Sequence, residues 1–264
     1  MSELRTALEG ALGPLYRVER EVRPVGDCRL FVALELQSGP ELLVKLLPAH
    51  LSLALDAARF ERELLLLAST LDHPGLVLPR SAGRAGSLVY HTRRFVEGTT
   101  LRAHLARHGP LPLRQTVETL RDVLGALAHV HARGIVHGDL KPESVLLAAG
   151  RALVVDAGIV GAVTRCLSGD VPGAASAALC AAPYIAPECL DGRAAAEPRH
   201  DMFAVGVLVH EMLTGRPPDA RSEPLEESRS VPPWLAELLG RCLAAAPRER
   251  WPDATAALDR PWPP

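Results

Sequence analysis

The stretch "IVHGDLKPESVLL", residues 135–147, constrains this chain more than any other part of its sequence. It places a histidine, an aspartate, a lysine and a serine at fixed offsets between two apolar runs. Apolar flanks predict buried segments on both sides, which would hold the four polar side chains in one loop of a packed scaffold. Polar side chains held in a loop by a rigid scaffold are typical of functional sites. The chain must therefore bury enough surface to fix such a loop.

Composition bounds the size and class of that scaffold. With 264 residues, 48% of them hydrophobic, and a net charge of −2, the chain can bury a core as one large domain or two small lobes. It has no charge excess of the kind that nucleic-acid binding requires, so we expect no nucleic-acid partner. Charged residues interrupt the long apolar runs, and the amino end is acidic rather than signal-like. We therefore expect a cytoplasmic protein without a membrane span.

The cysteines predict neither a disulfide framework nor a zinc site. Their number is odd, and no two of them are spaced as CxxC. Reduced thiols in a reducing compartment explain them better. The five are Cys28, Cys166, Cys180, Cys189 and Cys242.

The basic residues carry a more specific signal. Of 29 lysines and arginines only Lys45 and Lys141 are lysine, and the chain contains no asparagine. Arginine serves wherever positive charge alone is needed. A lysine retained in such a chain indicates a position that needs a compact, flexible ammonium group, which a planar guanidinium cannot replace.

The first part of the chain is predicted to form a sheet and a helix. Residues 16–47 contain three short runs with β-branched or alternating apolar residues, separated by turn signals, and predict an antiparallel meander. Residues 56–71 are predicted to be helical, because their large apolar residues recur at intervals of three and four. Glu63 lies beside that apolar stripe, where a carboxylate requires a cation. We expect Lys45, on the third strand, to be that cation.

The rest of the chain is predicted to be mainly helical, after a strand over residues 87–96 and a link at Glu97 and Gly98. Apolar periodicity predicts helices over 112–132 and 201–214. Residues 144–156 read as two strands around an Ala149/Gly150 turn, which would return Asp156 to the level of Asp139. Two carboxylates at the open end of a hairpin suggest a site for a metal and phosphate groups. The Ala- and Gly-rich stretch 159–181 is predicted to be a mobile loop.

At this point the chain resembles the eukaryotic-like Ser/Thr protein kinases of bacteria, from about residue 16 to residue 258. The order of the motifs carries the resemblance, since any one of them alone would be weak evidence. They are "VKLL" at 44–47, "RFEREL" at 59–64, "HGDLKPESVLL" at 137–147, "DAG" at 156–158, "APE" at 186–188 and "PRERW" at 247–251. Arg250 in the last motif is the expected partner of Glu188.

The resemblance implies an α+β, bilobal protein-kinase-like fold, with residues 1–264 forming a single domain. A small antiparallel sheet with an αC helix would form an N-lobe over 1–95. A mainly helical C-lobe would follow over 96–264. Only residues 219–230 separate "RPP" from "VPPW", so the substrate-docking αG region is expected to be shortened.

The resemblance also implies a role for each matching residue in ATP-dependent phosphoryl transfer. Lys45 would hold the α and β phosphates, and Glu63 would orient Lys45. Asp139 would accept the proton of the substrate hydroxyl, and Lys141 would stabilise the transferring phosphoryl group. Asp156 would hold Mg²⁺. The only two lysines of the chain thus fall on the two lysine positions of this mechanism.

The phosphate-binding loop departs from the family pattern. Gly26 and Leu146 are expected to line the ATP site, but Gly26 is the one glycine left in the loop, since its three glycine positions hold Arg23, Val25 and Cys28. Close backbone approach to the phosphates becomes harder without those glycines.

Other positions of the site depart as well. Ser144 replaces the asparagine that would hold a second Mg²⁺, so second-metal binding is altered and Mn²⁺ becomes an alternative. Arg93 falls at the back of the adenine pocket, where a cation would crowd the nucleotide or compete for Glu63. Ala157 and Ala181 replace an aromatic and a threonine of the family pattern. Gly138 replaces an arginine, so any activity should not depend on phosphorylation of the activation loop.

Three functions fit these observations. The first is a Ser/Thr protein kinase of weakened activity that transfers the γ-phosphoryl group of ATP to hydroxyls of a protein substrate. The second is a nucleotide-binding pseudokinase that acts as a switch or scaffold on a regulated partner protein. The third is a small-molecule phosphotransferase of the aminoglycoside or choline kinase type, because the catalytic loop of those enzymes also contains the sequence "HGD". The "APE" motif and Arg250 argue against this third function.

Overall fold

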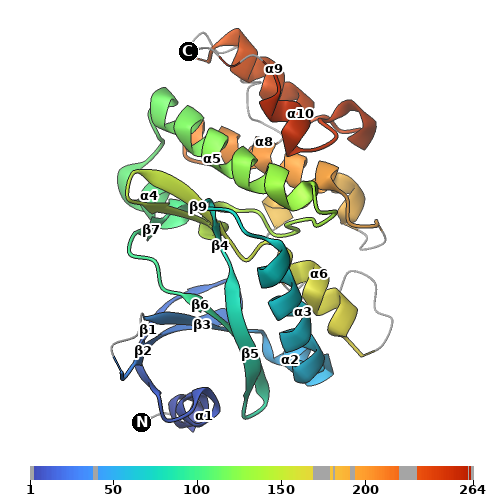
Figure 1. Ribbon diagram of the computed structural model, residues 1–264. Coiled ribbons are helices and arrows are strands. Elements are labelled where there is room, and N and C mark those ends of the chain that lie inside the picture. The colour runs from blue at the N-terminus through green and yellow to red at the C-terminus, as the bar shows by residue number, and fades with distance from the viewer. Residues whose placement is uncertain are drawn as a thin grey trace.

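The chain folds into two lobes joined by a short link, as a computed structural model shows (Figure 1). The structure describes residues 3–37, 41–168, 179–180, 182–190, 194–219, 231–260 and 262. An antiparallel sheet forms the amino-terminal lobe, and the carboxy-terminal lobe is mainly helical, so the predicted α+β bilobal architecture is confirmed. None of the helices in these ranges combines the length and the apolar character needed to cross a membrane.

The amino-terminal sheet has five strands in the order β1-β2-β3-β6-β5, each antiparallel to its neighbours. Its strands are β1 (Tyr16–Val25), β2 (Cys28–Glu35), β3 (Leu42–Leu46), β5 (Pro79–Ala85) and β6 (Leu88–Arg94). Helix α1 (Glu3–Leu12) covers one face, where Leu8 packs against Val44 and Leu46. Leu43 belongs to a separate cluster with Leu30. Because both faces are covered, β3 is buried along its whole length.

Helix α3 (Ala57–Thr70) follows the short helix α2 (Ala49–Ala54) and packs beside β5. It begins where predicted, because the Asp56 side chain accepts a hydrogen bond from the Arg59 backbone N–H at 3.0 Å and caps the first turn. The predicted apolar stripe is buried in the main core of the molecule. Its members are Phe60, Leu64, Leu67 and Leu71.

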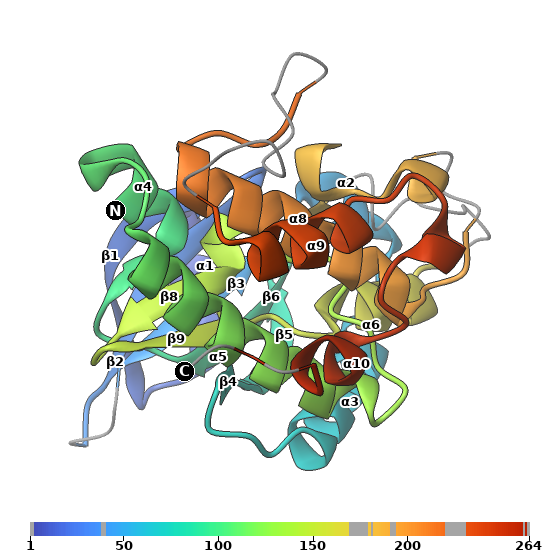
Figure 2. The ribbon, with the colours of Figure 1, turned by 90° about the horizontal axis from the view of Figure 1, so that it is seen from above.

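The carboxy-terminal lobe is organised around α5 (Leu113–His131) and α8 (Pro198–Thr214), which pack against each other; in the view of Figure 2, α9 (Pro233–Cys242) lies over α8. The helices predicted over 112–132 and 201–214 are therefore confirmed. Gly215 ends α8 in the left-handed conformation, with φ of 82°. The helices of this lobe are α4 (Leu101–His108), α5 (Leu113–His131), α6 (Ile159–Cys166), α8 (Pro198–Thr214), α9 (Pro233–Cys242) and α10 (Ala254–Leu258).

A second, small sheet lies where the two lobes meet, in the order β4-β9-β8-β7. Its strands are β4 (Leu76–Val77), β7 (Thr99–Thr100), β8 (Val145–Ala148) and β9 (Arg151–Val155). Ala149 and Gly150 form the predicted turn, both with positive φ. The link between the lobes requires a glycine, because a Cβ on Gly98 would come within 2.5 Å of the Leu147 carbonyl oxygen.

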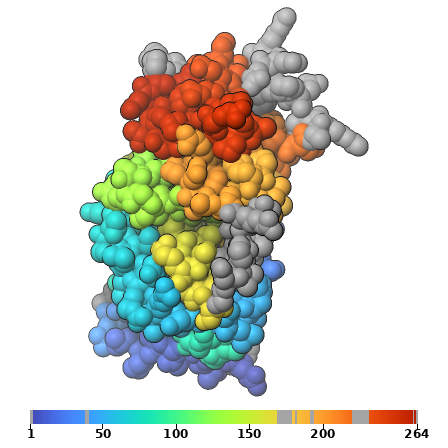
Figure 3. Space-filling model, turned by 90° about the vertical axis from the view of Figure 1, so that its right-hand side faces the viewer, coloured from blue at the N-terminus to red at the C-terminus, as the bar shows by residue number. Residues whose placement is uncertain are grey.

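The prediction of a loop over 159–181 is wrong for its first part, where α6 forms. Gly158 opens the helix in the left-handed conformation, and Val160 and Val163 are buried in the core that α6 shares with α3. Figure 3 shows α6, in yellow, lying on the surface against the cyan α3. Tertiary packing therefore overrides the Ala- and Gly-rich composition. Most of the rest of this predicted loop lies outside the described ranges, namely residues 169–178 and 181. The same holds for residues 220–230, where a shortened αG region was expected.

Candidate active site

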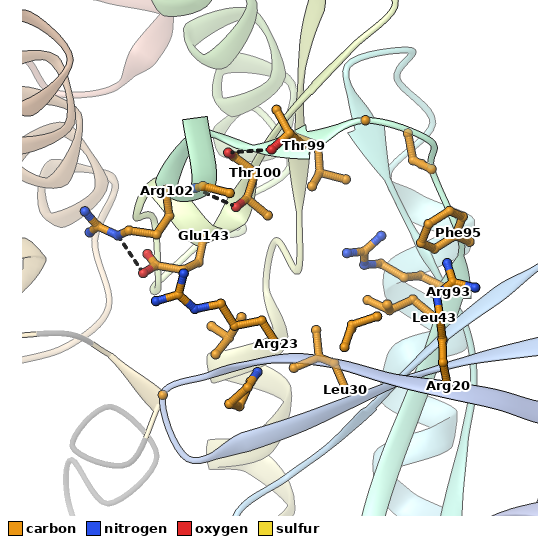
Figure 4. A pocket seen from close by; sticks show the side chains of 18 residues that line it. Arg20, Arg23, Leu30, Leu43, Arg93, Phe95, Thr99, Thr100, Arg102 and Glu143 are labelled. Carbon is orange, nitrogen blue, oxygen red and sulfur yellow. Dashed lines mark hydrogen bonds and ion pairs between the residues drawn. The ribbon is translucent and has the colours of Figure 1, made fainter. Parts of the chain in front are cut away.

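The cleft between the lobes holds a cavity of about 420 Å³ (Figure 4). Apolar side chains from the sheet line its roof, and Leu146 on β8 lines it from the other lobe. The sheet contributes Val22, Val25, Leu30 and Leu43. Predicted residue Gly26 also borders the cavity. Four arginines and Glu143 also line the cavity. Its apolar part is suited to a flat organic ligand such as a nucleotide base.

A smaller cavity beyond it brings together five of the predicted site residues. They are Lys45, Asp139, Lys141, Ser144 and Asp156. The hairpin β8–β9 thus returns Asp156 to the neighbourhood of Asp139, as the sequence predicted. The cluster holds both lysines of the chain and two of the three acids to which the sequence assigned a role, Asp139 and Asp156 but not Glu63.

Lys45 and Asp156 form a buried ion pair, with Lys45 Nζ donating to Asp156 Oδ2 at 2.6 Å. Burial alone would raise the pKa of the Asp156 carboxyl, but the positive charge of Lys45 and the nearby Arg93 hold it well below its usual range. The same contact raises the pKa of Lys45 against the effect of its burial. Asp156 has a φ of 64°, a strained conformation for a non-glycine residue that is common at functional sites.

The predicted pairing of Glu63 with Lys45 is wrong in this structure. Glu63 Oε2 instead accepts a hydrogen bond from Arg165 Nε at 2.8 Å. The reason is α6, which packs on α3 and brings Arg165 to the Glu63 carboxylate. Lys45 meanwhile contacts Asp156. Glu63 is thus held near the surface, and its side chain remains 23% exposed.

Asp139 and Lys141 contact each other directly. Lys141 Nζ lies 2.7 Å from both carboxylate oxygens of Asp139 and 2.7 Å from the Leu179 carbonyl oxygen. Burial raises the pKa of the Asp139 carboxyl even though Lys141 opposes the shift. Leu179 also packs against the roof cluster that contains Leu30 and Leu43. Leu179 therefore covers Lys141, which pairs with Asp139.

The loop that carries Asp139 is fixed by Asp201 on α8. Its carboxylate accepts hydrogen bonds from the backbone N–H groups of His137 at 2.7 Å and Gly138 at 2.9 Å, and lies 2.9 Å from His131 Nε2. His137 is fully buried and contacts the Val155 carbonyl through its ring at 3.0 Å. These contacts give His137 a structural role in the loop. The loop is thus tied to two central helices.

The local geometry favours a glycine at position 138. Its φ is 80°, and a Cβ at this position would lie 3.2 Å from Val160 Cβ on α6. A side chain would be strained by the backbone and would press on α6. The residue that the sequence singled out as a departure thus leaves room for the helix that holds Glu63 away from Lys45.

Ser144 is buried, and its hydroxyl is engaged with the backbone of Lys141. Ser144 Oγ accepts from Lys141 N at 2.9 Å and donates to Lys141 O at 2.8 Å. A hydroxyl has one donor and two acceptor lone pairs. One lone pair of Ser144 therefore remains as a potential metal ligand.

Arg93 on β6 lies at the back of the cleft, as the sequence predicted, and lines both cavities. Figure 4 shows its side chain extending into the larger one. Its Nε is 3.9 Å from Asp156 Oδ1, and the residue is only 8% exposed. Burial lowers the pKa of its guanidinium, although Asp156 opposes the shift. Arg93 therefore competes with Lys45 for Asp156, and not for Glu63 as expected.

Two residues that shape the site were missed by the sequence reasoning. Arg165 holds Glu63, and Leu179 covers Lys141, but neither belongs to a motif or a periodic pattern. Their roles depend on how α6 packs against α3 and on where Leu179 lies beside Lys141. One remote contact was found in advance: Arg250 binds both carboxylate oxygens of Glu188, at 2.6 and 2.9 Å.

The chain matches the family described as protein kinase domain over residues 29–263. It is 32% identical to Serine/threonine-protein kinase PknL of Mycobacterium tuberculosis over 276 residues, which cover 96% of this chain and 66% of PknL. It is 31% identical to Serine/threonine-protein kinase PrkC of Bacillus subtilis, covering 77% of this chain and 31% of PrkC. The chain thus spans just under two thirds of PknL and about a third of PrkC.

Solved structures show the same fold. The kinase domain of M. tuberculosis PknI superposes with a TM-score of 0.68 at 23% identity, covering 93% of this chain and 94% of that one. Rad53 residues 1–466, solved in complex with AMP-PNP, give a TM-score of 0.73 at 22% identity, covering 96% of this chain and 67% of that one. At these identities the likeness concerns the fold alone.

Proposed function

Because the chain belongs to the protein kinase family, we propose that it binds ATP between its lobes and transfers the γ-phosphoryl group to a serine or threonine hydroxyl of a protein. One observation carries the proposal: both lysines of a chain that otherwise uses arginine lie in one small cavity, each paired with an acid. A structural ion pair would not require lysine in preference to arginine.

The residues of the cleft fit ATP and a divalent cation. The apolar slot around Leu43 and Leu146 is suited to the base, and Lys45 supplies a buried ammonium group for the phosphates. Asp156 offers a fully ionised carboxylate for Mg²⁺ or Mn²⁺, and Ser144 offers one lone pair. ATP would supply the phosphoryl group, and the metal would neutralise its charge.

The chain's own residues then act on the substrate hydroxyl. Asp139 would accept the proton of that hydroxyl, and burial makes its carboxylate a stronger base than an exposed aspartate. Lys141, held against Asp139, would stabilise negative charge next to the same oxygen. Both roles require Leu179 to leave Lys141, which it now contacts through its carbonyl.

The same geometry supports weakened or gated activity. Lys45 lacks Glu63 as a partner, because Arg165 holds that carboxylate on the surface side of α3. Productive binding would require Glu63 to exchange Arg165 for Lys45. We propose that the chain exchanges between this closed arrangement and an assembled one, so that its basal rate of transfer is low.

A pseudokinase is the second candidate, and the covered state of Asp139 favours it. In that case the chain would bind nucleotide through Lys45 and Asp156 but leave Leu179 in place over Lys141. The nucleotide would then act through a change in shape that a regulated partner protein recognises. In either case we propose that residues 1–264 form a single domain in the cytoplasm, with an N-lobe over 1–95 and a C-lobe over 96–264. The odd number of cysteines, without any CxxC spacing, agrees with a reducing compartment.

Paired binding and transfer assays test the proposal. MgATP should raise the melting temperature of the purified chain, and Lys45→Met should abolish that shift. Label from γ-labelled ATP should appear on the chain itself or on a generic basic protein and disappear in Asp139→Asn, with Mn²⁺ tried beside Mg²⁺. Binding without any transfer would favour the pseudokinase. Absence of a thermal shift with every nucleotide would overturn both candidates.

A further inference from the structure

Arg102 on α4 lies in a receptor of three acceptor groups beside the cleft. Its Nε donates to Glu143 Oε1 at 2.8 Å, its Nη1 to Glu211 Oε1 at 2.5 Å and its Nη2 to the Tyr184 hydroxyl oxygen at 2.8 Å. The Tyr184 hydroxyl in turn donates to the second oxygen of Glu211. Each nitrogen of the guanidinium therefore has an acceptor on a different segment of the chain.

The three acceptor groups around Arg102 come from three separate parts of the chain. Glu143 belongs to the loop of Asp139 and Lys141, Tyr184 to the segment that follows Leu179, and Glu211 to α8. Glu211 is 1% exposed, so its charge requires a cation close by. Two carboxylates and a phenol around one guanidinium form a fork-shaped site that an ammonium group fits poorly.

The receptor lies next to the loop that carries Asp139 and Lys141, on which the proposed transfer to a protein substrate depends. Glu143 comes two residues after Lys141 in the sequence, and Arg102 and Glu143 both line the larger cavity. Figure 4 shows their contact at its edge. The Arg102 side chain is 32% exposed, so the mouth of the receptor reaches solvent. An arginine of a bound polypeptide would meet the same three acceptors if Arg102 were absent.

We propose that Arg102 is a specificity-determining residue: it fills a guanidinium-binding subsite from within, so that the chain does not select substrates with an arginine at that position. The proposal rests on the proposed protein kinase function but deepens it, because it concerns which polypeptides bind beside Asp139. The receptor without Arg102 would carry an unbalanced negative charge and would bind an external guanidinium.

Binding of a small guanidinium compound tests the subsite without any phosphoryl transfer. Agmatine carries a guanidinium and an amino group at the two ends of a butyl chain. In a thermal-shift titration it should raise the melting temperature of Arg102→Ala and leave that of the native chain unchanged. The compound 1,4-diaminobutane, which lacks the guanidinium, should change neither melting temperature. Arg107→Ala, on the exposed side of the same helix, is the matched control and should behave like the native chain. If Arg102→Ala does not fold, Arg102→Gln replaces it. A folded variant that agmatine does not stabilise would overturn the proposal.

Peptide pairs test the effect on specificity. One peptide carries arginine and its partner carries the uncharged analogue citrulline at the same place, scanned along the residues before the phosphorylated serine. For the native chain, the KM of the arginine peptide should equal that of the citrulline peptide at every position. For Arg102→Ala, the KM of the arginine peptide should be about tenfold lower than that of the citrulline peptide at one position, because hydrogen bonds to charged groups have about this effect. Equal ratios in both proteins would contradict the proposal. Absence of transfer in both, with agmatine binding intact, would overturn the proposed function alone.

Discussion

At the residue scale, Arg93 has the most direct bearing on nucleotide binding. Its guanidinium is buried at the back of the cleft, 3.9 Å from the carboxylate that would hold the metal. A cation in this position takes up space at the end of the apolar slot. It also shares Asp156 with Lys45 and so weakens the charge available to a divalent cation.

We predict that Arg93→Met binds MgATP more tightly. Methionine keeps the site filled with a flexible apolar side chain but removes the competing charge, so the Kd measured by calorimetry should fall by about tenfold, or about 1.4 kcal/mol. Arg94→Met, at the exposed neighbouring position, should leave the Kd unchanged. A Kd that rises in Arg93→Met would mean instead that Arg93 binds the phosphates.

Lys141 shows why the chain retains lysine here. Its ammonium group meets three oxygens, two from Asp139 and one from Leu179, each at 2.7 Å. An ammonium has three donors that rotate about a single nitrogen, whereas a guanidinium spreads its donors over a plane. We predict that Lys141→Arg lowers single-turnover transfer by about a hundredfold, or about 2.7 kcal/mol, and leaves MgATP binding intact. If Lys141→Arg transferred the phosphoryl group as fast as the native chain, arginine could replace lysine at this position, and the retention of lysine would no longer support the proposed function.

At the scale of elements, α6 decides the state of the site. It packs against α3 and holds Glu63 through Arg165, an ion pair whose arginine side chain is 51% exposed. Exposed pairs contribute at most about 1 kcal/mol. The closed arrangement is therefore held mainly by the apolar face of α6, and the pair adds a small bias.

We predict that Arg165→Ala raises the basal transfer rate, because Glu63 is then free to pair with Lys45. Because the Arg165–Glu63 ion pair contributes at most about 1 kcal/mol, the transfer rate should rise by no more than about fivefold. Initial rates of labelling can resolve such a change. Arg62→Ala, an exposed arginine on α3, should not change the rate. The gain should vanish when Glu63→Gln is added to Arg165→Ala; a gain that persists in the double variant would show that Glu63 is not the group released.

The elements themselves were largely predictable, but their pairing across the cleft was not. Local periodicity and caps predict α3, since its stripe from Phe60 to Leu71 depends only on neighbours along the chain. Motif order placed Lys45, Asp139, Lys141 and Asp156 in one cluster. The partner of Glu63 could not be derived, because it depends on whether α6 forms. That helix has little intrinsic propensity and is stabilised by tertiary packing on α3.

At the scale of the whole molecule, Asp201 couples the active-site loop to the core of the larger lobe. It is 2% exposed and accepts hydrogen bonds from two backbone N–H groups of the loop, and it contacts His131 on α5. Unfolding would return all these donors to water. The position of Asp139 and the stability of the fold therefore depend on one ionised carboxylate.

This coupling predicts how stability depends on pH. Burial would raise the pKa of the Asp201 carboxyl, but its hydrogen bonds with His131 and the loop hold the pKa below its usual range. A carboxyl with a lower pKa in the folded state contributes its full stabilisation above its unfolded pKa of about 4. That contribution to stability is lost as the pH falls through the pKa that Asp201 has in the folded state.

We predict that Asp201→Asn lowers the free energy of unfolding at pH 7 by about 2–3 kcal/mol, because an amide cannot accept both backbone hydrogen bonds as a carboxylate does. The variant should also lose stability less steeply than the native chain as the pH falls from 5 to 3, since it has no charge to lose at this position. Urea unfolding at a series of pH values measures both effects. Asp27→Asn, at an exposed turn, should follow the native chain. Equal slopes for Asp201→Asn and the native chain would contradict the assignment of the acid sensitivity to Asp201.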